Sequence, residues 1–172
     1  QDGLAEKIEK RTRKQFPNGI DSYGSDALRM MFFSLATHAK EISFEMGRLK
    51  GYRNFCTKIW NAGRFIQNFE NHNEKFEPKN NADNKILNDF NKCKQRVERN
   101  IEEFRLDLAM NEVYEFFWSK FCDEYLEACK NLNETKNLLP IYKEILVFIH
   151  PFAQFITEEL HTIFFNAPII ER

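Results

Sequence analysis

The stretch 46-MGRLKGYRNFCTKIWNAGRFIQNF-69 contains the clearest helical pattern in the chain. Its apolar positions recur in alternating steps of three and four, which is the spacing of one face of an α-helix. These positions are Leu49, Tyr52, Cys56, Ile59, Gly63 and Ile66. The pattern predicts a helix from Met46 to about Phe69.

Helical patterns also occur on both sides of this stretch. They predict helices at 4–16, 26–35, 84–103, 106–130, 138–149 and 152–165, the second with Ser25 as its N-cap and the last with Pro151 at its start. The polar residues 71–81 predict a loop, and 37–43 a connector. We therefore expect an all-α protein: a helical bundle of four to five long helices over 36–172, preceded by a short helical lead-in over 1–35.

The composition agrees with this fold class. The 172 residues include only 6 glycines and 5 prolines, too few for the turns of a β-sandwich or barrel, whereas 18 phenylalanines predict an aromatic-rich core. No apolar run is long enough to span a membrane, and no signal peptide opens the sequence. We expect a cytoplasmic protein that is part of a longer chain, since its first residue is Gln.

The sequence contains no recognisable catalytic, metal or cofactor motif. The four cysteines are Cys56, Cys93, Cys122 and Cys129; they form no CxxC pair, and we expect free, buried thiols. The four histidines stand apart, and no phosphate-binding, nucleotide-binding or hydrolase motif occurs. We expect no catalytic residue, no metal and no cofactor within this chain.

One face of the 46–69 helix carries candidate binding residues. At about 100° per residue, with Leu49 at 0°, the apolar face centres near about 320°, while Lys58 falls near about 180° and Phe65 near about 160°. Asn54 and Asn61 fall near about 140° and about 120°. In nucleic-acid binding, an exposed ring stacks on a base, a cation binds phosphate, and amides form hydrogen bonds with base edges. The alternative is that Phe65 packs against a neighbouring helix and Lys58 is merely solvated.

The same part of the chain is basic, although the formal net charge of the whole is only −1. Between residues 40 and 65 only Glu41 and Glu45 oppose six cations, which are Lys40, Arg48, Lys50, Arg53, Lys58 and Arg64. This local excess favours a polyanionic partner and adds Arg48 and Arg53 to the candidate contacts.

Several blocks of the sequence resemble, in order, the bacterial-type valyl-tRNA synthetases of class I. They are KRTRKQFPNGI (10–20), YGSDALR (23–29), SLAT (34–37), RLKGYRNFCTKIWNAGRF (48–65), FFWSKFCDEYLE (116–127) and HPFAQFITEEL (150–160). Isoleucyl and leucyl enzymes share the YGxDxLR block, but the run GYRNFCTKIWNAGRF is similar to the valyl version.

The resemblance implies the segment after the catalytic domain together with the anticodon-binding helical bundle. The HIGH and KMSKS motifs are absent, so ATP and the ligation of valine to tRNA would belong to the parent enzyme. The implied partner is valine tRNA, read by a monomer, with Lys58 and Phe65 at the family's anticodon-contacting positions. Gly47 departs from the family, which has Lys or Arg there.

The resemblance also implies structural roles. Trp118, Phe121, Cys122 and Tyr125 would belong to the bundle core, while Asp26 and Arg29 would hold the lead-in helix against its neighbours. Two alternatives stay open at this point: the corresponding domain of an isoleucyl enzyme, and a helical protein-interaction module that docks a partner helix near Phe65.

Overall fold

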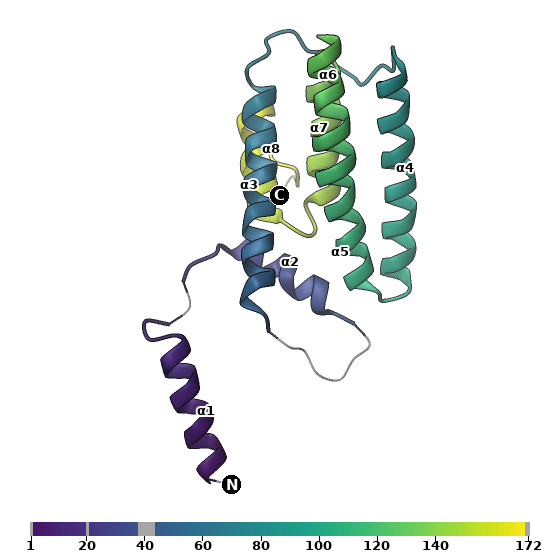
Figure 1. Ribbon diagram of the computed structural model, residues 1–172. Coiled ribbons are helices and arrows are strands. Elements are labelled where there is room, and N and C mark those ends of the chain that lie inside the picture. The colour runs from purple at the N-terminus through teal and green to yellow at the C-terminus, as the bar shows by residue number, and fades with distance from the viewer. Residues whose placement is uncertain (1, 20, 38–43, 171–172) are drawn as a thin grey trace.

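The computed structural model describes residues 2–19, 21–37 and 44–170, and these ranges contain helices and no strands (Figure 1). The predicted all-α class is therefore confirmed. Most of the expected connector, including His38 and Lys40, lies outside the described residues. The helices are α1 (Asp2–Gln15), α2 (Ser25–Leu35), α3 (Met46–Ile66), α4 (Asn81–Glu102), α5 (Leu106–Glu115), η1 (Phe116–Leu126), α6 (Glu127–Leu132), α7 (Leu138–Ile149) and α8 (Gln154–Phe165).

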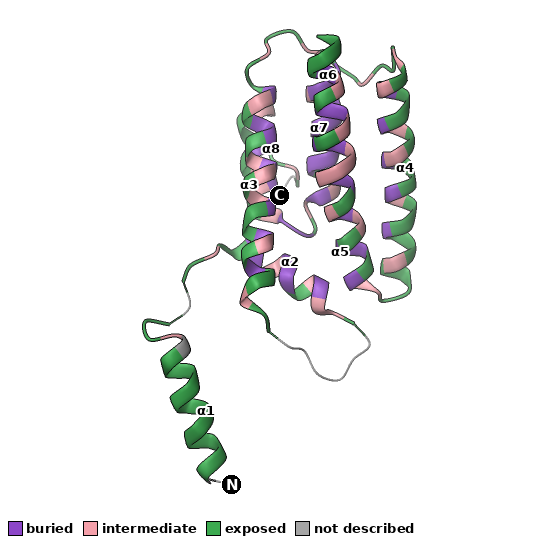
Figure 2. Cartoon of the chain, viewed as in Figure 1, coloured by how far each residue is buried: buried purple, intermediate pink, exposed green. Residues whose placement is uncertain are grey.

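The core lies between α3, the α5–η1 pair, α7 and α8, whose inward faces are buried (Figure 2). α4 packs on the outside of α5 and η1, and α2 crosses the end of the bundle against α3, α5 and α8. The predicted aromatic core is confirmed by stacked and edge-on rings. Phe121 lies 5.9 Å from Tyr142 between centroids, and Phe55 lies 5.5 Å from Phe117.

The segment 106–132 is one continuous rod, as Figure 1 shows, but it is not one α-helix. Its middle, η1, is a π-helix. Each backbone N–H of a π-helix bonds to the carbonyl five residues earlier, so residues five apart lie closer to the same side than in an α-helix, where they are about 140° apart. Such turns occur preferentially at functional sites. The predicted helix at 106–130 is confirmed in extent and corrected in geometry.

The start of α2 differs from the prediction by one residue. Gly24, not Ser25, is the N-cap, and its φ of +88° lies in a region that side chains rarely adopt. The sequence favoured Ser25 because serine is a good cap. The backbone turn needed before the helix requires glycine instead.

Asp26 and Arg29 connect α2 to the far end of the chain, as the resemblance implied. Asp26 accepts hydrogen bonds from the backbone N–H groups of Phe155 (3.2 Å) and Ile156 (2.7 Å) in the first turn of α8. Arg29 donates to the carbonyl of Pro151 at 2.9 Å. A carboxylate from α2 thus supplies acceptors for the first turn of α8, which begins at Gln154 and not at Phe152 as predicted.

A buried polar cluster fixes the loop between α3 and α4. Asp83 is 3% exposed and accepts hydrogen bonds from Tyr125 Oη (2.7 Å) and Asn137 Nδ2 (3.0 Å). The Asn137 side chain also donates to the Glu77 carbonyl at 2.6 Å and accepts from the Glu77 N–H at 3.1 Å. The loop therefore has a defined path over the end of the bundle although it contains no helix.

The first helix, α1, lies apart from the bundle (Figure 1). By contrast, α2 packs directly on bundle helices although it was assigned to the lead-in segment. The proposed boundary between residues 35 and 36 stays a prediction. Within the described residues, none of the helices is both long and apolar enough to cross a membrane.

Candidate nucleic-acid interface

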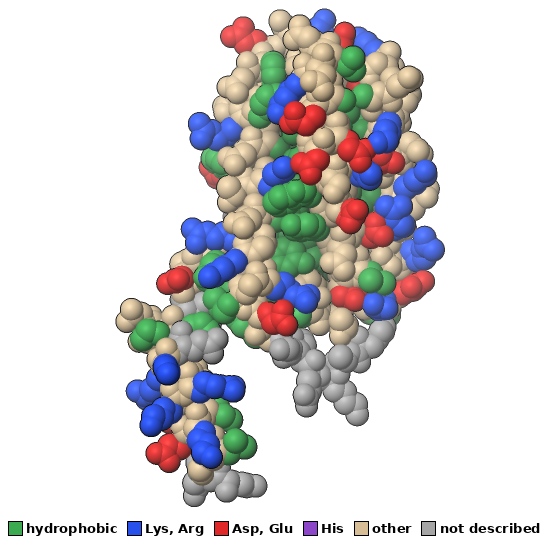
Figure 3. All heavy atoms as spheres, viewed as in Figure 1, with side chains coloured by type: hydrophobic (Ala, Val, Ile, Leu, Met, Phe, Trp, Pro, Cys, Tyr) green, Lys and Arg blue, Asp and Glu red, His purple; other side chains and the backbone are tan. Residues whose placement is uncertain are grey.

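The face of the molecule where α3 packs on η1, and where Lys130 of α6 reaches α3, contains the predicted pair, Lys58 and Phe65. In Figure 3 a column of hydrophobic side chains runs down the middle of this side, with Lys or Arg next to Asp or Glu above it. We call it the α3–η1 face and define it by six residues: Lys58, Phe65, Trp118, Asp123, Glu127 and Lys130.

Lys58 is not a free cation. Its Nζ lies 3.0 Å from Asp123 Oδ1 and 4.8 Å from the centroid of the Trp118 ring. The side chain of Lys58 is 32% exposed and that of Asp123 is 54% exposed. The ion pair therefore sits at the surface, where water screens it and a competing anion can displace the carboxylate.

Phe65 is half-buried, so the prediction that it points away from the core is wrong. Its ring packs edge-on against Phe69 at 5.1 Å, and Lys130 Nζ stands 4.7 Å from its centroid. The buried positions of α3 include Phe55 and Ala62, which the count from sequence omitted. With these two included and the half-buried Cys56 left out, the buried face centres near about 280°, about 40° closer to Lys58 and Phe65 than predicted.

The remaining predicted contacts divide into two groups. Asn54, Asn61 and Arg48 are exposed, as expected. Arg53 is also exposed, but its guanidinium donates to the Ser22 carbonyl at 3.3 Å and lies 5.7 Å from the Tyr23 ring centroid. The structure thus connects Arg53 to the segment before α2 and does not bring it to Lys58.

Two glycines of α3 differ in their surroundings. A Cβ at Gly47 would have no described atom within 4 Å, so a lysine fits there without a clash. A Cβ at Gly63 would lie 3.0 Å from Tyr142 Oη and 3.1 Å from Leu160 Cδ2. Gly63 therefore lets α3 approach α7 and α8 closely.

Trp118, Asp123 and Lys130 were not predicted as site residues. Trp118 was assigned to the core, but it is half-buried, stacks on Tyr114 at 5.5 Å and lies under Lys58. Its predicted companions in the core, Phe121, Cys122 and Tyr125, are buried. The α-helical period could not place Trp118 and Asp123 on one side, because residues five apart are about 140° apart in an α-helix and approach one side in the wider π-helix.

The thiols offer no nucleophile. Cys93, Cys122 and Cys129 are buried and Cys56 is half-buried, and all four are free, as predicted. Burial raises the pKa of the Cys56, Cys93 and Cys122 thiols to about 12 and that of Cys129 to about 11. They are therefore protonated near neutral pH.

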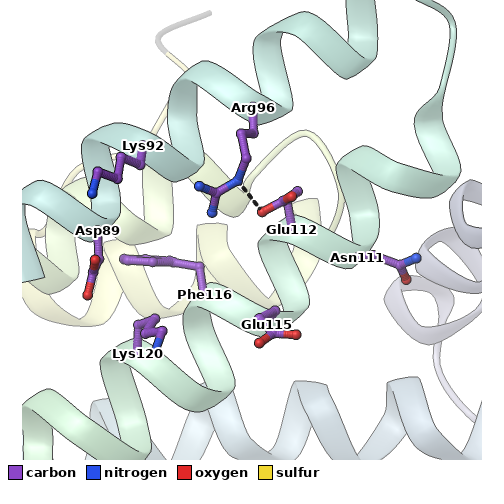
Figure 4. Close-up of a pocket in the computed structure, with 8 residues that line it drawn as sticks. All are labelled: Asp89, Lys92, Arg96, Asn111, Glu112, Glu115, Phe116 and Lys120. Atoms are coloured by element: carbon purple, nitrogen blue, oxygen red, sulfur yellow. Dashed lines mark hydrogen bonds and ion pairs between the residues drawn. The ribbon is translucent and has the colours of Figure 1, made fainter.

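The pocket between α4 and the α5–η1 rod is charged on both sides (Figure 4). Arg96 Nε lies 2.7 Å from Glu112 Oε2, and this bond raises the pKa of Arg96. Three acidic and three basic side chains line it in total, namely Asp89, Glu112, Glu115, Lys92, Arg96 and Lys120. No three His, Cys, Asp or Glu residues of the described part of the chain gather as metal ligands.

The comparisons with known proteins identify the family. Residues 83–171, which include most of α4, the α5–η1–α6 rod, α7 and α8, match the family described as the anticodon-binding domain of tRNA ligase. The chain belongs to this family. The description of this family favours recognition of a tRNA anticodon over a helical protein-interaction module.

Three similar relatives carry the name valine–tRNA ligase. The protein of Wigglesworthia glossinidia brevipalpis is 41% identical over 91% of this chain and 20% of its own length. The one of Buchnera aphidicola is 42% identical over 93% of this chain and 18% of its own length. The one of Dechloromonas aromatica is 39% identical over 91% and 19%. The chain spans about a fifth of the length of these relatives.

Proposed function

We propose that this domain reads the anticodon of a valine tRNA and is the tRNA-recognition part of a valine–tRNA ligase. The observation that carries the proposal is the α3–η1 face, where two aromatic rings and two lysines lie on α3 and on the adjoining η1 and α6, which belong to the part of the chain that matches the anticodon-binding family. The identity to valine–tRNA ligases over nine-tenths of the chain favours valine tRNA over isoleucine tRNA.

The chemistry of this face suits an unpaired loop of RNA. Splayed-out bases stack on aromatic rings, and Phe65 and Trp118 supply two such rings. Once released from Asp123, Lys58 reaches a phosphate, and the exposed amides of Asn54 and Asn61 can bond to base edges. Arg48, ten residues before Lys58 and so about 15 Å away along α3, extends the contact to the backbone.

Ligation itself belongs to the parent enzyme in this proposal. That enzyme joins valine to its tRNA with ATP, in the cytoplasm, and the domain contributes recognition without a cofactor of its own. We propose that the domain acts as a monomer, because a tRNA anticodon loop engages a single α3–η1 face.

A titration with valine tRNA and isoleucine tRNA over a range of salt concentrations tests this function. We expect tighter binding of valine tRNA and a steep loss of affinity with salt, since each neutralised phosphate releases counterions. Equal affinity for the two tRNAs would contradict the assignment to valine.

Lys58→Ala sharpens the same experiment. Because a phosphate contact positions RNA without reading its sequence, we expect weaker binding of both tRNAs and a smaller salt slope. Lys92→Ala, which removes an exposed cation from α4, is the matched control and should leave binding unchanged. An unaltered slope for Lys58→Ala would remove Lys58 from the interface.

A further inference from the structure

The α3–η1 face contains the same three-part arrangement twice. At one place Lys58 stands over the Trp118 ring and pairs with Asp123. At the other, Lys130 stands over the Phe65 ring at 4.7 Å and pairs with Glu127 at 2.6 Å. In each case the ring that could receive a base is covered by a lysine, and a carboxylate holds that lysine in place.

Lys58 and Lys130 can move off the two rings without unfolding of the helices. The side chains of Lys58 and Lys130 are 32% and 42% exposed, and those of Asp123 and Glu127 are 54% and 56% exposed. Ion pairs at such exposure contribute little to stability, and lysine has a long flexible stem. A phosphate arriving with an RNA loop therefore competes with the carboxylate for the ammonium group.

Once Lys58 has moved to a phosphate, Asp123 lies beside the Trp118 ring without its ion-pair partner. Trp118 and Asp123 are five residues apart in the π-helix η1, so both lie on the side of the helix that faces Lys58. An ionised carboxylate has two hydrogen-bond acceptors and no donor. It accepts from the exocyclic amino group of adenine or cytosine and repels the carbonyl edge of uracil.

We propose that Asp123 is a specificity-determining residue. It holds Lys58 over Trp118 in the free protein and, once Lys58 has moved to phosphate, accepts a hydrogen bond from the amino group of the base at that ring. The inference rests on the proposed function, because it requires an RNA loop on the α3–η1 face.

A panel of anticodon stem-loops tests Asp123. In each RNA one loop adenine is replaced by purine, or one loop cytosine by pyrimidin-2-one, so that only an exocyclic amino group is lost. For the wild-type protein we expect one replacement to weaken binding about tenfold, as for a hydrogen bond to a charged group. For Asp123→Ala the same replacement should change binding less than twofold, because the carboxylate that accepts from the amino group is gone.

Glu98→Ala is the charge-matched control, since it removes an exposed carboxylate from α4. It should keep the tenfold preference. If Asp123→Ala keeps the preference as well, or if no replacement weakens wild-type binding, the role of Asp123 is overturned while RNA binding stands. Failure of the wild-type protein to bind any stem-loop would instead overturn the proposed function.

Discussion

Gly63 and Gly51 both lie on α3, but substitution by alanine should change the stability of the protein in opposite directions at the two positions. A methyl group at Gly63 would press on Tyr142, whose hydroxyl cannot easily move because it donates to the Ile59 carbonyl at 2.7 Å. We expect Gly63→Ala to lower the free energy of unfolding by about 1–3 kcal/mol, as overpacking does. A Cβ at Gly51 would have no described atom within 4 Å, so Gly51→Ala should raise the free energy of unfolding by about 0.5–1 kcal/mol.

Urea denaturation of the two variants measures these changes. Equal effects of the two substitutions would contradict the close approach of α3 to α7 and α8.

Phe65 has two roles that can be measured separately. Because its ring is half-buried against Phe69, we expect Phe65→Ala to lower the free energy of unfolding by about 1–2 kcal/mol. It should weaken tRNA binding by about 1–3 kcal/mol, the usual range for base stacking, with little change in salt slope.

Phe121→Ala is the control for Phe65, since Phe121 is fully buried and its truncation should cost about 3–5 kcal/mol. Thermal melts beside tRNA titrations separate the outcomes. A Phe65 variant as unstable as the Phe121 variant would show that Phe65 serves the core and not the RNA.

Gly47→Lys restores a cation at the position where the resembled family has one. Since the site is exposed and open, we expect modestly tighter tRNA binding without loss of stability. One further phosphate neutralised in a single-stranded loop would add about 0.7 to the log–log salt slope. An unchanged slope would place residue 47 away from the RNA.

At the scale of elements, an ion pair in the turn between α4 and α5 predicts that the stability of the protein depends on pH. Arg105 donates two hydrogen bonds to Asp107, at 2.9 and 2.8 Å, and holds the pKa of that carboxyl below its usual value. A carboxyl whose pKa is lowered by folding stabilises the protein above its unfolded pKa of about 4 and loses this effect as pH falls further.

We therefore expect the melting temperature of the wild type to exceed that of Asp107→Asn at pH 6. The difference should shrink steadily below about pH 4. A difference that grows on acidification would contradict the Arg105 interaction. Glu98→Gln, with the same change of charge on an exposed part of α4, controls for net charge.

The limits of sequence-based prediction also become clear at this scale. The helix positions followed from spacing, because a 3.6-residue period is visible in the sequence of α3 and α4. The composition of the α3–η1 face did not follow, because the π-helical turn that aligns Trp118 with Asp123 has no period of its own in the sequence. Lys58 lies at the surface of α3, as its position on the helix predicted, but its partners Trp118 and Asp123 come from η1, about 60 residues later.

At the scale of the molecule, long-range polar contacts could not be predicted either. Asp26 caps α8 from 129 residues away, and Asp83 joins the α3–α4 loop to Asn137. Only the family resemblance gave Asp26 a structural role, and nothing in the sequence around Asp83 marks it as buried, although each is buried with its partners. The class of fold was predictable because apolar spacing is local, whereas these contacts depend on how the helices pack.

The central claim is that the domain recognises tRNA at the anticodon, and one measurement tests it most directly. Valine tRNA and the same tRNA with its three anticodon nucleotides replaced are titrated against the protein at one salt concentration. We predict that the replacement weakens binding about tenfold or more, since stacking and base-edge contacts are lost while phosphates are kept. Equal affinity for the two tRNAs would contradict the account.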